Sequence, residues 1–229
     1  MIYVQLFEVT NGVFKNQCYL VHNQYEGILI DPAWDYEGIN SYIKENGILL
    51  KGVLITHGHL DHIDLAEEFS KKNNVPIWSS KGDAINFGLT YSKLQLVYHL
   101  QNFKIGTIEI TPILTPGHTP GSVCYVIDNH IFSGDTVFIE GVGICSKEGA
   151  ASLYDSVQFL KIYLPESSLF WPGHSYGQAP GKSLSYLMLY NIYFQFNSKK
   201  SFIAFRTRKN QPKLFQWIFS KKKNDSSSL

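Results

Sequence analysis

Histidine and aspartate gather in one short stretch of this 229-residue chain, in a pattern that suits metal-dependent chemistry. Residues 57–62 read His-Gly-His-Leu-Asp-His, so four potential metal ligands fall within six positions. Neutral imidazole and carboxylate are ligands that zinc favours. Gly58 is expected to let the backbone turn tightly between the first two histidines. The pattern therefore indicates a metal site rather than a histidine-rich surface loop.

Further potential ligands recur after other apolar segments. In each case a strand-like run leads into a glycine-bearing loop that holds one ligand: His118 in TPGHTPGS, Asp135 in SGDT and His174 in WPGH. The same arrangement also describes the 57–62 stretch, which directly follows the apolar run GVLIT. This repetition favours one metal site assembled from several loops.

The segments between these motifs predict strands alternating with helices. Runs of β-branched and aromatic residues predict strands at 2–9, 18–22, 27–31, 52–56, 75–80, 106–115, 122–128, 130–138 and 168–174. Helical spacing predicts helices at 36–46 (closed by Gly47), 63–73, 152–163 and 182–196. In the third helix, Leu153, Val157, Leu160 and Ile162 are expected to face inward. Residues 81–100 predict a loop with a partial helix. The alternation favours a layered α/β architecture with helices outside two sheets.

Composition excludes several classes of protein. Hydrophobic residues make up 44% of the chain and charged residues 17%, which argues against disorder outside the polar tail, residues 221–229. Lys and Arg number 20 against 19 Asp and Glu. This near-neutral balance argues against nucleic-acid binding, which needs a surplus of basic residues. The absence of an apolar run of ~18 residues and of an export signal predicts a soluble, cytoplasmic protein with no membrane partner.

The four motifs in this order and spacing resemble the metallo-β-lactamase superfamily, and most closely its glyoxalase II-like hydrolase branch. The resemblance covers roughly residues 2–177. It implies an α/β fold, the αββα sandwich, with metals at one edge between the two sheets. The corresponding hydrolase domain would span residues 1–181. An aromatic, short helical C-terminal extension over residues 182–220 would then pack on it.

The resemblance also implies a ligand set for two zinc ions per chain. It assigns His57, His59 and His118 to the first ion, Asp61, His62 and His174 to the second, and Asp135 as a bridge between them. Asp61 would in addition orient the catalytic hydroxide.

Four other residues stand close to, or outside, this ligand set. Asp31 matches a family position that supports the ligand loop, although an Asp-Pro pair is equally typical of a turn. His22, His99 and His130 lack motif context and are not expected to bind metal.

Two zinc ions can share a water, lower its pKa towards neutrality and polarise a carbonyl group. A thiol leaves as thiolate with little acid help, and no dedicated acid stands near the motifs. The sequence therefore favours a hydrolase acting on thioesters or esters. A glyoxalase II-type glutathione thioesterase, a lactonase, a persulfide dioxygenase with one iron and a non-catalytic metal-dependent sensor remain alternatives.

Departures from the family pattern bear on the substrate. The Lys and Tyr with which glyoxalase II binds glutathione correspond here to Ile144 and Ser146. Tyr176 matches a family tyrosine, and the segment from Arg206 to Lys209 resembles the family's basic C-terminal cluster. These features favour a pantetheine-type thioester, on coenzyme A or an acyl carrier protein, over a glutathione thioester.

The C-terminal extension is rich in aromatic residues. These either pack on the sandwich or form the wall of an acyl-chain channel, with Arg206 and Lys209 meeting a phosphate. The extension resembles the stand-alone zinc hydrolases of bacterial polyketide synthase clusters, which are thought to be thioesterases on carrier-bound acyl groups. The resemblance implies a role in polyketide or antibiotic biosynthesis. The basic stretch 206–213 would then receive the acidic face of a carrier protein.

Overall fold

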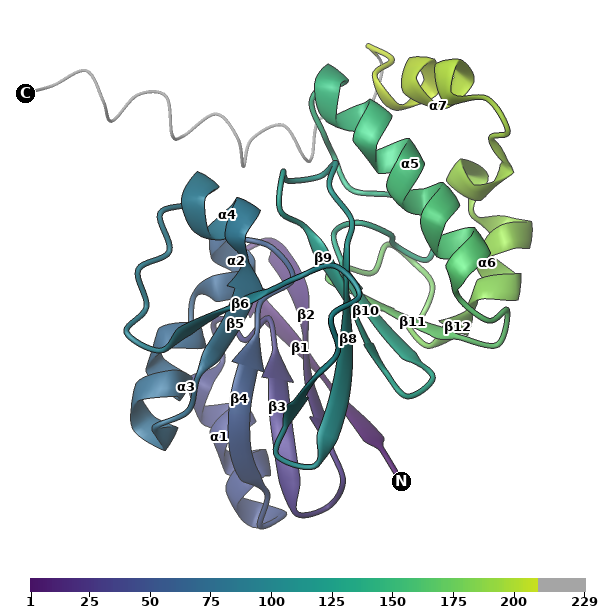
Figure 1. Cartoon of the computed structure of the whole chain (residues 1–229). Helices are drawn as coiled ribbons and strands as arrows, with labels where there is room; N and C mark the ends of the chain where they lie inside the picture. Colours follow the sequence, from purple (N-terminus) through teal and green to yellow (C-terminus); the bar gives the residue numbers. More distant parts are fainter. Residues whose placement is uncertain (210–229) are drawn as a thin grey trace, which may run out of the picture.

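Two six-stranded sheets form the centre of the molecule (Figure 1). The structure is a computed structural model that describes residues 1–209. The first sheet has the order β1 (Tyr3–Asn11), β2 (Phe14–His22), β3 (Glu26–Ile30), β4 (Leu49–Leu54), β5 (Ile77–Ser80), β6 (Leu94–Val97). The second has the order β12 (Lys182–Ser183), β11 (Leu169–Pro172), β10 (His130–Gly134), β9 (Val123–Ile127), β8 (Ile108–Leu114), β7 (Phe103–Ile105).

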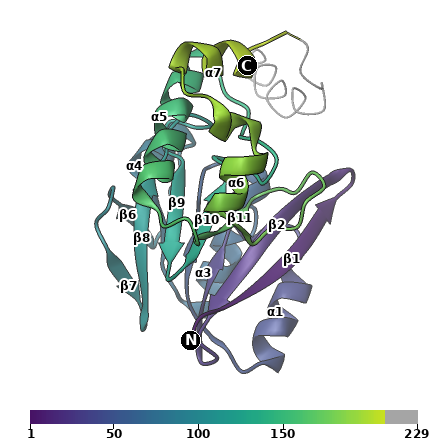
Figure 2. The ribbon, with the colours of Figure 1, turned by 90° about the vertical axis from the view of Figure 1, so that its right-hand side faces the viewer.

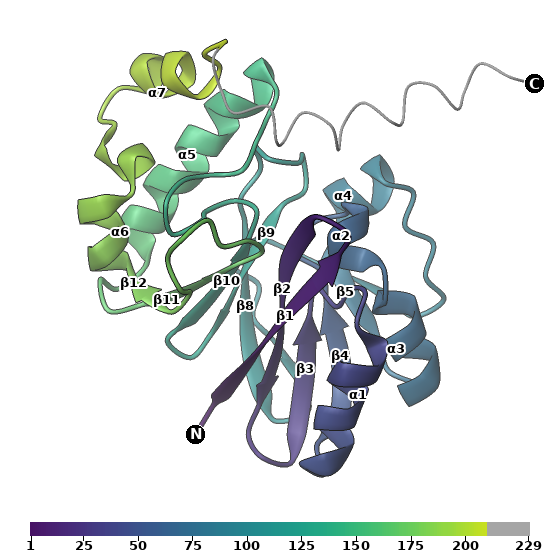
Figure 3. The ribbon, with the colours of Figure 1, turned by 180° about the vertical axis from the view of Figure 1, so that it is seen from behind.

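Helices cover the outer faces of both sheets. The first sheet carries α1 (Tyr36–Glu45) and α3 (Ala66–Asn73), while α2 (Leu60–Ile63) and α4 (Lys81–Asn86) lie at one edge (Figure 3). The second carries α5 (Lys147–Tyr163), α6 (Leu184–Tyr190), the 3-10 helix η1 (Ile192–Gln195) and α7 (Lys199–Arg206) (Figure 2). The expected helix–sheet–sheet–helix arrangement is therefore observed.

Strand alternation divides the apolar side chains among three cores. On β2, Tyr19 and Val21 face the core between the sheets, whereas Cys18 and Leu20 face the helices of the first sheet. Successive side chains of a strand point to opposite faces, so each sheet supplies two cores. A third core, which includes Phe170, lies between the second sheet and its helices.

Strand direction places all the predicted ligand loops at one edge. In the first sheet β3, β4 and β5 are parallel. In the second, β8 and β10 both pair antiparallel with β9, and β10 pairs parallel with β11, so β8, β10 and β11 share one direction. The loops that follow these six strands therefore leave from the carboxyl ends of their sheets, where functional sites of α/β proteins commonly lie.

The structure corrects several sequence predictions in the first sheet. Strand β2 begins at Phe14, four positions before the predicted start, and pairs along its whole length with the edge strand β1. The helix predicted at 63–73 begins only at Ala66 as α3, and Ile63 instead ends the preceding short helix α2. Residues 81–100 contain the strand β6 as well as the short helix α4. Gly47 does close the first helix, with a φ of 62°.

Helix α5 begins five residues before its predicted start, because the Ser146 hydroxyl accepts a hydrogen bond from Gly149 N and caps it. Leu153, Val157 and Leu160 are buried as expected. Ile162, however, is 85% exposed, so its predicted inward orientation is wrong. Residues two positions apart lie on different sides of a helix, and Ile162 follows the buried Leu160 by two.

The C-terminal extension is not the single helix predicted over 182–196. Asn191 ends α6, accepts a hydrogen bond from Tyr193 N and donates its amide to the carbonyls of Phe138 and Gly141. Tyr193 and Phe202 are buried against the second sheet's helices, which supports packing as the role of these aromatics. The rest of the predicted extension and the tail predicted to be disordered, residues 210–229, lie outside the described residues.

Across residues 1–209, no helix has the length and apolar character needed to cross a bilayer.

Candidate metal centre

The predicted ligands meet at the shared edge of the two sheets in two groups. The first group is His57, His59 and His118; the second group is Asp61, His62 and His174. Within each group the potential ligand atoms lie within 4.8 Å of one another. Each group takes two residues from the loop and short helix after β4 and one from a loop of the second sheet. Both sheets are therefore needed to build either group.

Asp135 lies between the two groups. Its Oδ1 is 3.4 Å from His62 Nε2 and 3.5 Å from His174 Nε2, and its Oδ2 is 3.5 Å from His118 Nε2. Asp61 Oδ2 lies 3.7 Å from His62 Nε2 and 3.6 Å from His174 Nε2. A tetrahedral zinc ion with bonds of ~2.0–2.1 Å separates its ligand atoms by about 3.3–3.4 Å. The observed spacings are close to those of ligands around a metal.

Unpartnered buried atoms provide a second test of whether a metal fits. Within the described residues, His57 Nε2, His62 Nε2 and Asp135 Oδ1 are buried and have no hydrogen-bond partner. Buried polar atoms nearly always have one, because an unpaired buried group is costly. These three atoms belong to the two groups and to the residue between them, and all three are suitable zinc ligands. The residues present therefore fit a metal pair.

Hydrogen bonds orient three of the imidazole rings so that Nε2 faces the centre, whereas His59 turns its Nδ1 towards His118 Nε2, 3.0 Å away. His62 Nδ1–H donates to Asp31 Oδ2 (3.0 Å). His118 Nδ1–H donates to Ile144 O (2.6 Å), and His174 Nδ1–H donates to Lys15 O (2.8 Å). A ring that donates through Nδ1 keeps the lone pair of Nε2 for a metal. The tautomer needed for metal binding is thus fixed by neighbouring groups.

Asp31 supports both groups. Its carboxylate accepts hydrogen bonds from Thr56 N (2.7 Å), from Thr56 Oγ1 (2.5 Å) and from His62 Nδ1. The Thr56 hydroxyl, which donates to Asp31, lies 3.1 Å from His57 Nδ1 and can accept from it. Asp31, His57 and His62 also have potential ligand atoms within 4.8 Å of one another, but the hydrogen bonds that the Asp31 carboxylate accepts favour a role in positioning the histidines. Asp31 therefore does more than form a turn.

Sequence reasoning missed Asp83, which joins two ligand loops. Its Oδ2 accepts hydrogen bonds from Gly58 N and Thr119 Oγ1, and its Oδ1 accepts one from Gly121 N, each at 2.8 Å. Asp83 is fully buried at the start of α4. The available signal was Ser80, whose hydroxyl accepts from Asp83 N, since Ser-x-x-Asp is a pattern of helix N-termini.

Gly58 is needed for space and not for an unusual backbone angle. It is absent from the glycines with positive φ among the described residues. A Cβ at Gly58 would lie 2.3 Å from the ring of Phe87, which also packs edge-on against His59 with ring centroids 5.2 Å apart. The predicted reason for this glycine was therefore wrong, and close packing replaces it.

Burial keeps the first group neutral. It lowers the pKa of His57 well below its ordinary value and lowers the pKa of His59 to about 3. The pKa of His118 is also lowered by burial, which outweighs the opposing effect of Asp135. Neutral imidazole is the form that binds metal, so this group needs no loss of protons at pH 7.

Neighbouring carboxylates favour the protonated form of the imidazoles in the second group. Burial by itself would lower the pKa of His62, but Asp61, Asp135 and Asp31 together raise it to about 10. Burial likewise opposes a raised pKa at His174, where Asp135 outweighs it. In the metal-free protein the second group therefore holds protons that a metal has to displace.

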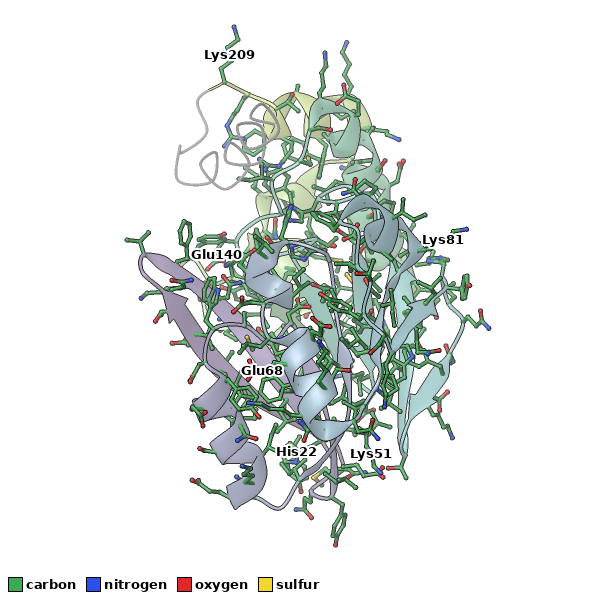
Figure 4. The ribbon with its side chains drawn as sticks, turned by 90° about the vertical axis from the view of Figure 1, so that its left-hand side faces the viewer. His22, Lys51, Glu68, Lys81, Glu140 and Lys209 are labelled. Carbon is green, nitrogen blue, oxygen red and sulfur yellow. The ribbon has the colours of Figure 1, made fainter. Side chains whose placement is uncertain are left out.

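The residues predicted to bind substrate fall in different places. Tyr176 is 45% exposed and its ring stacks beside His174, with centroids 6.1 Å apart. Ile144 is half-buried, and its carbonyl orients His118. Arg206 is buried, and its Nε donates to Gly143 O at 2.9 Å, so this edge of the guanidinium supports a loop. Lys209 is exposed and points away from the molecule (Figure 4). Phosphate contact by Arg206 and Lys209 stays a prediction.

A cavity of about 620 Å³ opens beside His118. It lies between the loop that follows β8 and the start of α5, and its walls are Pro116, Gly117, His118, Thr119, Pro120, Ile144, Cys145, Ser146, Glu148, Gly149 and Ser152. The cavity therefore includes the two positions, Ile144 and Ser146, that depart from the glutathione-binding pattern. Of the part of the aromatic extension that the structure describes, residues 182–209, none lines the cavity, so these residues do not form the expected acyl-chain wall there.

The three remaining histidines of the sequence analysis each accept a hydrogen bond at Nδ1. The donors are Gln24 N for His22, Leu114 N for His99 and Trp171 Nε1 for His130. His22 lies in the lower part of the molecule in Figure 4, below Lys81, the first residue of α4. Within residues 1–209, none of the three belongs to a group that could hold a metal.

Comparison with known proteins agrees with this geometry. The chain is 36% identical over 218 residues to the probable polyketide biosynthesis zinc-dependent hydrolase BaeB of Bacillus velezensis, covering 93% of this chain and 97% of that protein. It is 37% identical over 208 residues to the corresponding PksB of Bacillus subtilis, covering 89% and 92%. A metallo-beta-lactamase structure from Staphylococcus aureus superposes with a TM-score of 0.81 at 25% identity, covering 92% of this chain and 68% of that one.

The family model of the metallo-beta-lactamase superfamily matches residues 11–174, a span that includes both ligand groups and Asp135. This match extends over well more than half of the chain. The chain therefore belongs to the metallo-beta-lactamase superfamily.

Proposed function

We propose that this chain is a dizinc hydrolase that cleaves acyl thioesters. The observation that carries the proposal is the pair of three-ligand groups with Asp135 between them and three buried ligand atoms left unpartnered. The relatives whose names describe zinc-dependent hydrolases of polyketide biosynthesis cover nearly the whole chain and support hydrolysis as its activity.

Two zinc ions bound here would polarise the thioester carbonyl and make hydroxide available at neutral pH. Asp61 would orient the attacking water and accept its proton, because Oδ2 faces both His62 and His174 and the side chain remains 16% exposed. Asn16 Nδ2 donates to the Asp61 carbonyl at 2.5 Å and fixes the backbone of this residue. The two catalytic requirements, orientation and proton transfer, thus meet at one carboxylate.

A water-derived nucleophile suits this site better than a cysteine. Burial raises the pKa of Cys18 and raises that of Cys124 to about 11, so both remain thiols. Cys145 lines the cavity, but burial also raises its pKa despite the nearby Arg206. A thiol leaving group needs little protonation, which matches a site with no separate general acid among the described residues.

The substrate we propose is a pantetheine-type thioester, carried on coenzyme A or an acyl carrier protein, in polyketide or related metabolism. Ile144 and Ser146 in the cavity replace the charged and phenolic groups that would hold glutathione. Loss of a hydrogen bond to a charged group costs about 1.5–3 kcal/mol, which corresponds to one to two orders of magnitude in affinity. The exposed Tyr176 beside His174 would contact the substrate next to the metals.

The test compares kcat/KM for acetyl-pantetheine, an acetylated acyl carrier protein and S-lactoylglutathione under the same conditions. We expect the pantetheine and carrier thioesters to exceed the glutathione thioester by at least about tenfold. Equal or faster turnover of S-lactoylglutathione would refute the substrate class. Failure to hydrolyse any of the three by protein loaded with zinc would refute the thioesterase.

A further inference from the structure

The described walls of the cavity beside His118 contain an acidic side chain but no basic one. Among the described residues, no Lys or Arg lines it, and Glu148 supplies its only carboxylate. Glu148 is exposed in the first turn of α5 and lines the cavity together with Ser146 and Gly149. Apart from a metal held by His118, the charge that the described walls present to a group in the cavity is therefore negative.

The first turn of α5 would otherwise favour an anion. A helix N-terminus carries partial positive charge and unpaired N–H groups. Here the chain supplies its own partners: the Ser146 hydroxyl accepts from Gly149 N. The Glu148 carboxylate accepts from its own backbone N–H and from Ser146, which holds its pKa below the ordinary value. The positive end of the helix is thus already matched by a carboxylate.

The basic residues nearest to this wall do not line the cavity. Arg206 is 5% exposed, its Nε donates to Gly143 O, and its guanidinium lies near the wall residue Cys145. Lys147 precedes Glu148 in the chain but does not line the cavity. Glu148 is therefore the one Asp, Glu, Lys or Arg side chain among the described walls of the cavity.

We propose that Glu148 determines charge specificity, so that the part of the thioester which enters this cavity is uncharged and anionic groups are disfavoured. The inference rests on the proposed thioesterase and narrows its substrates. A neutral amide arm or an alkyl chain fits the apolar and small side chains of the walls, whereas a free carboxylate would face Glu148 at short range. The resident carboxylate acts as the repulsive element that discrimination between similar substrates needs.

Three matched thioesters distinguish the effect of a charge at the acyl end of the substrate from that of a charge at the thiol end. Hexanoyl-N-acetylcysteamine is neutral, adipoyl-N-acetylcysteamine adds a carboxylate at the acyl end, and the hexanoyl thioester of 3-mercaptopropionate adds one at the thiol end. The measured quantity is the ratio of kcat/KM for each anionic thioester to that for the neutral thioester. A ratio cancels any general change in activity of a variant.

In Glu148→Gln we expect one of the two ratios, the one whose charged end enters the cavity, to rise about two- to fivefold, since solvent weakens the interaction between exposed charges. In Glu148→Lys the same ratio should rise further. Both increases should shrink when the ionic strength is raised, because salt screens exposed charges. Affinity for the matching ketone analogues, in which CH₂ replaces the thioester sulfur, should change in the same direction and reports on binding alone.

Glu166→Gln is the matched control. Glu166 is exposed just beyond the other end of α5, roughly 25 Å along the helix from Glu148, and does not line the cavity. Ratios that stay unchanged in both Glu148 variants, or that change equally in Glu166→Gln, would overturn the inference while leaving the thioesterase standing. A wild-type protein that hydrolyses none of the three substrates would instead refute the thioesterase and this inference with it.

Discussion

The two ligand groups are built alike but held by different parts of the molecule. Each takes two residues from the segment after β4 and one from the second sheet. The first group is fixed by Asp83, which ties its two loops together, and by the carbonyl of Ile144. The second is fixed by the N-terminal strand β2, through the carbonyl of Lys15 and the amide of Asn16. Apart from Asp31, which contacts both, the two ligand groups therefore have separate supports.

The groups also differ in charge before any metal binds. The first contains imidazoles alone, with pKa values lowered by burial. The second mixes imidazole with carboxylate, which raises the pKa of His62 to about 10 despite burial. The imidazoles of the first group are thus neutral at pH 7 and can bind a metal directly, whereas a metal that binds to the second group must displace protons. We expect the two sites to fill in that order.

Asp135 lies between the two ligand groups and is predicted to bridge their metals, so its removal should have the largest effect. In Asp135→Asn we expect kcat/KM to fall by about four orders of magnitude and bound zinc to fall to one equivalent or less. The measurements are thioester hydrolysis and elemental analysis of the purified variant. Two retained zinc equivalents with activity within tenfold of the wild type would show that Asp135 is not shared.

Asp61 belongs to the second group alone, and its loss should separate the groups. Asp61→Ala should lower kcat about a thousandfold with a smaller effect on KM, because the residue orients the nucleophile rather than the substrate. The first group should keep its zinc. A loss of kcat smaller than tenfold, a barrier change of only ~1.4 kcal/mol, would contradict the role assigned to Asp61.

Asp83 tests the support of the first group without touching a predicted ligand. Asp83→Ala should weaken the first zinc by about 10- to 100-fold, as is typical when groups that orient metal ligands are lost. Asp83→Asn retains an oxygen acceptor and should restore part of this affinity. Competition with a chromophoric chelator measures both variants. If zinc affinity fell equally in the two variants, or fell at the second group only, Asp83 would not be a specific support of the first group.

The difference in protonation predicts a pH dependence for the second zinc alone. Because the pKa of His62 is raised, the metal-free group is protonated from acidic pH up to about 10, so each metal bound there must displace a proton. The affinity of the second equivalent should rise about tenfold per pH unit between pH 6.5 and 8.5 beyond that of the first. Zinc titration of metal-free protein in weak buffer, with proton release recorded, checks this. Equal proton release for both equivalents would contradict it.

The ligands could be predicted from sequence because their signal is local. Residues 57–62 and the single-ligand loops show their chemistry within a few positions, and alternating apolar residues place strands before them. Asp83 could not be found this way, since its partners Gly58 and Gly121 lie 25 and 38 residues away. The role of the Ile144 carbonyl is equally invisible, because any residue at this position carries the same backbone group.

Element boundaries failed where tertiary hydrogen bonds overrode local propensity. The aromatic residues around Asn191 predict a continuous helix, but its buried amide bonds to Phe138 O and Gly141 O and ends the helix there. The prediction for Ile162 fails for another reason: its position two residues after the buried Leu160 places it on a different side of the helix. The error at Asn191 concerns what a residue packs against, which a single sequence does not state, whereas helical spacing could have placed Ile162 correctly.

Metal analysis of protein purified without chelator, with activity measured on the same sample, tests whether two zinc ions serve thioester hydrolysis. We expect about two zinc equivalents per chain and a pantetheine-thioesterase activity that is lost on chelation and returns with zinc. A content well below one equivalent under metal-replete conditions would contradict this expectation. One equivalent of iron with oxygen consumption on persulfides would contradict it too, and would make the protein a dioxygenase.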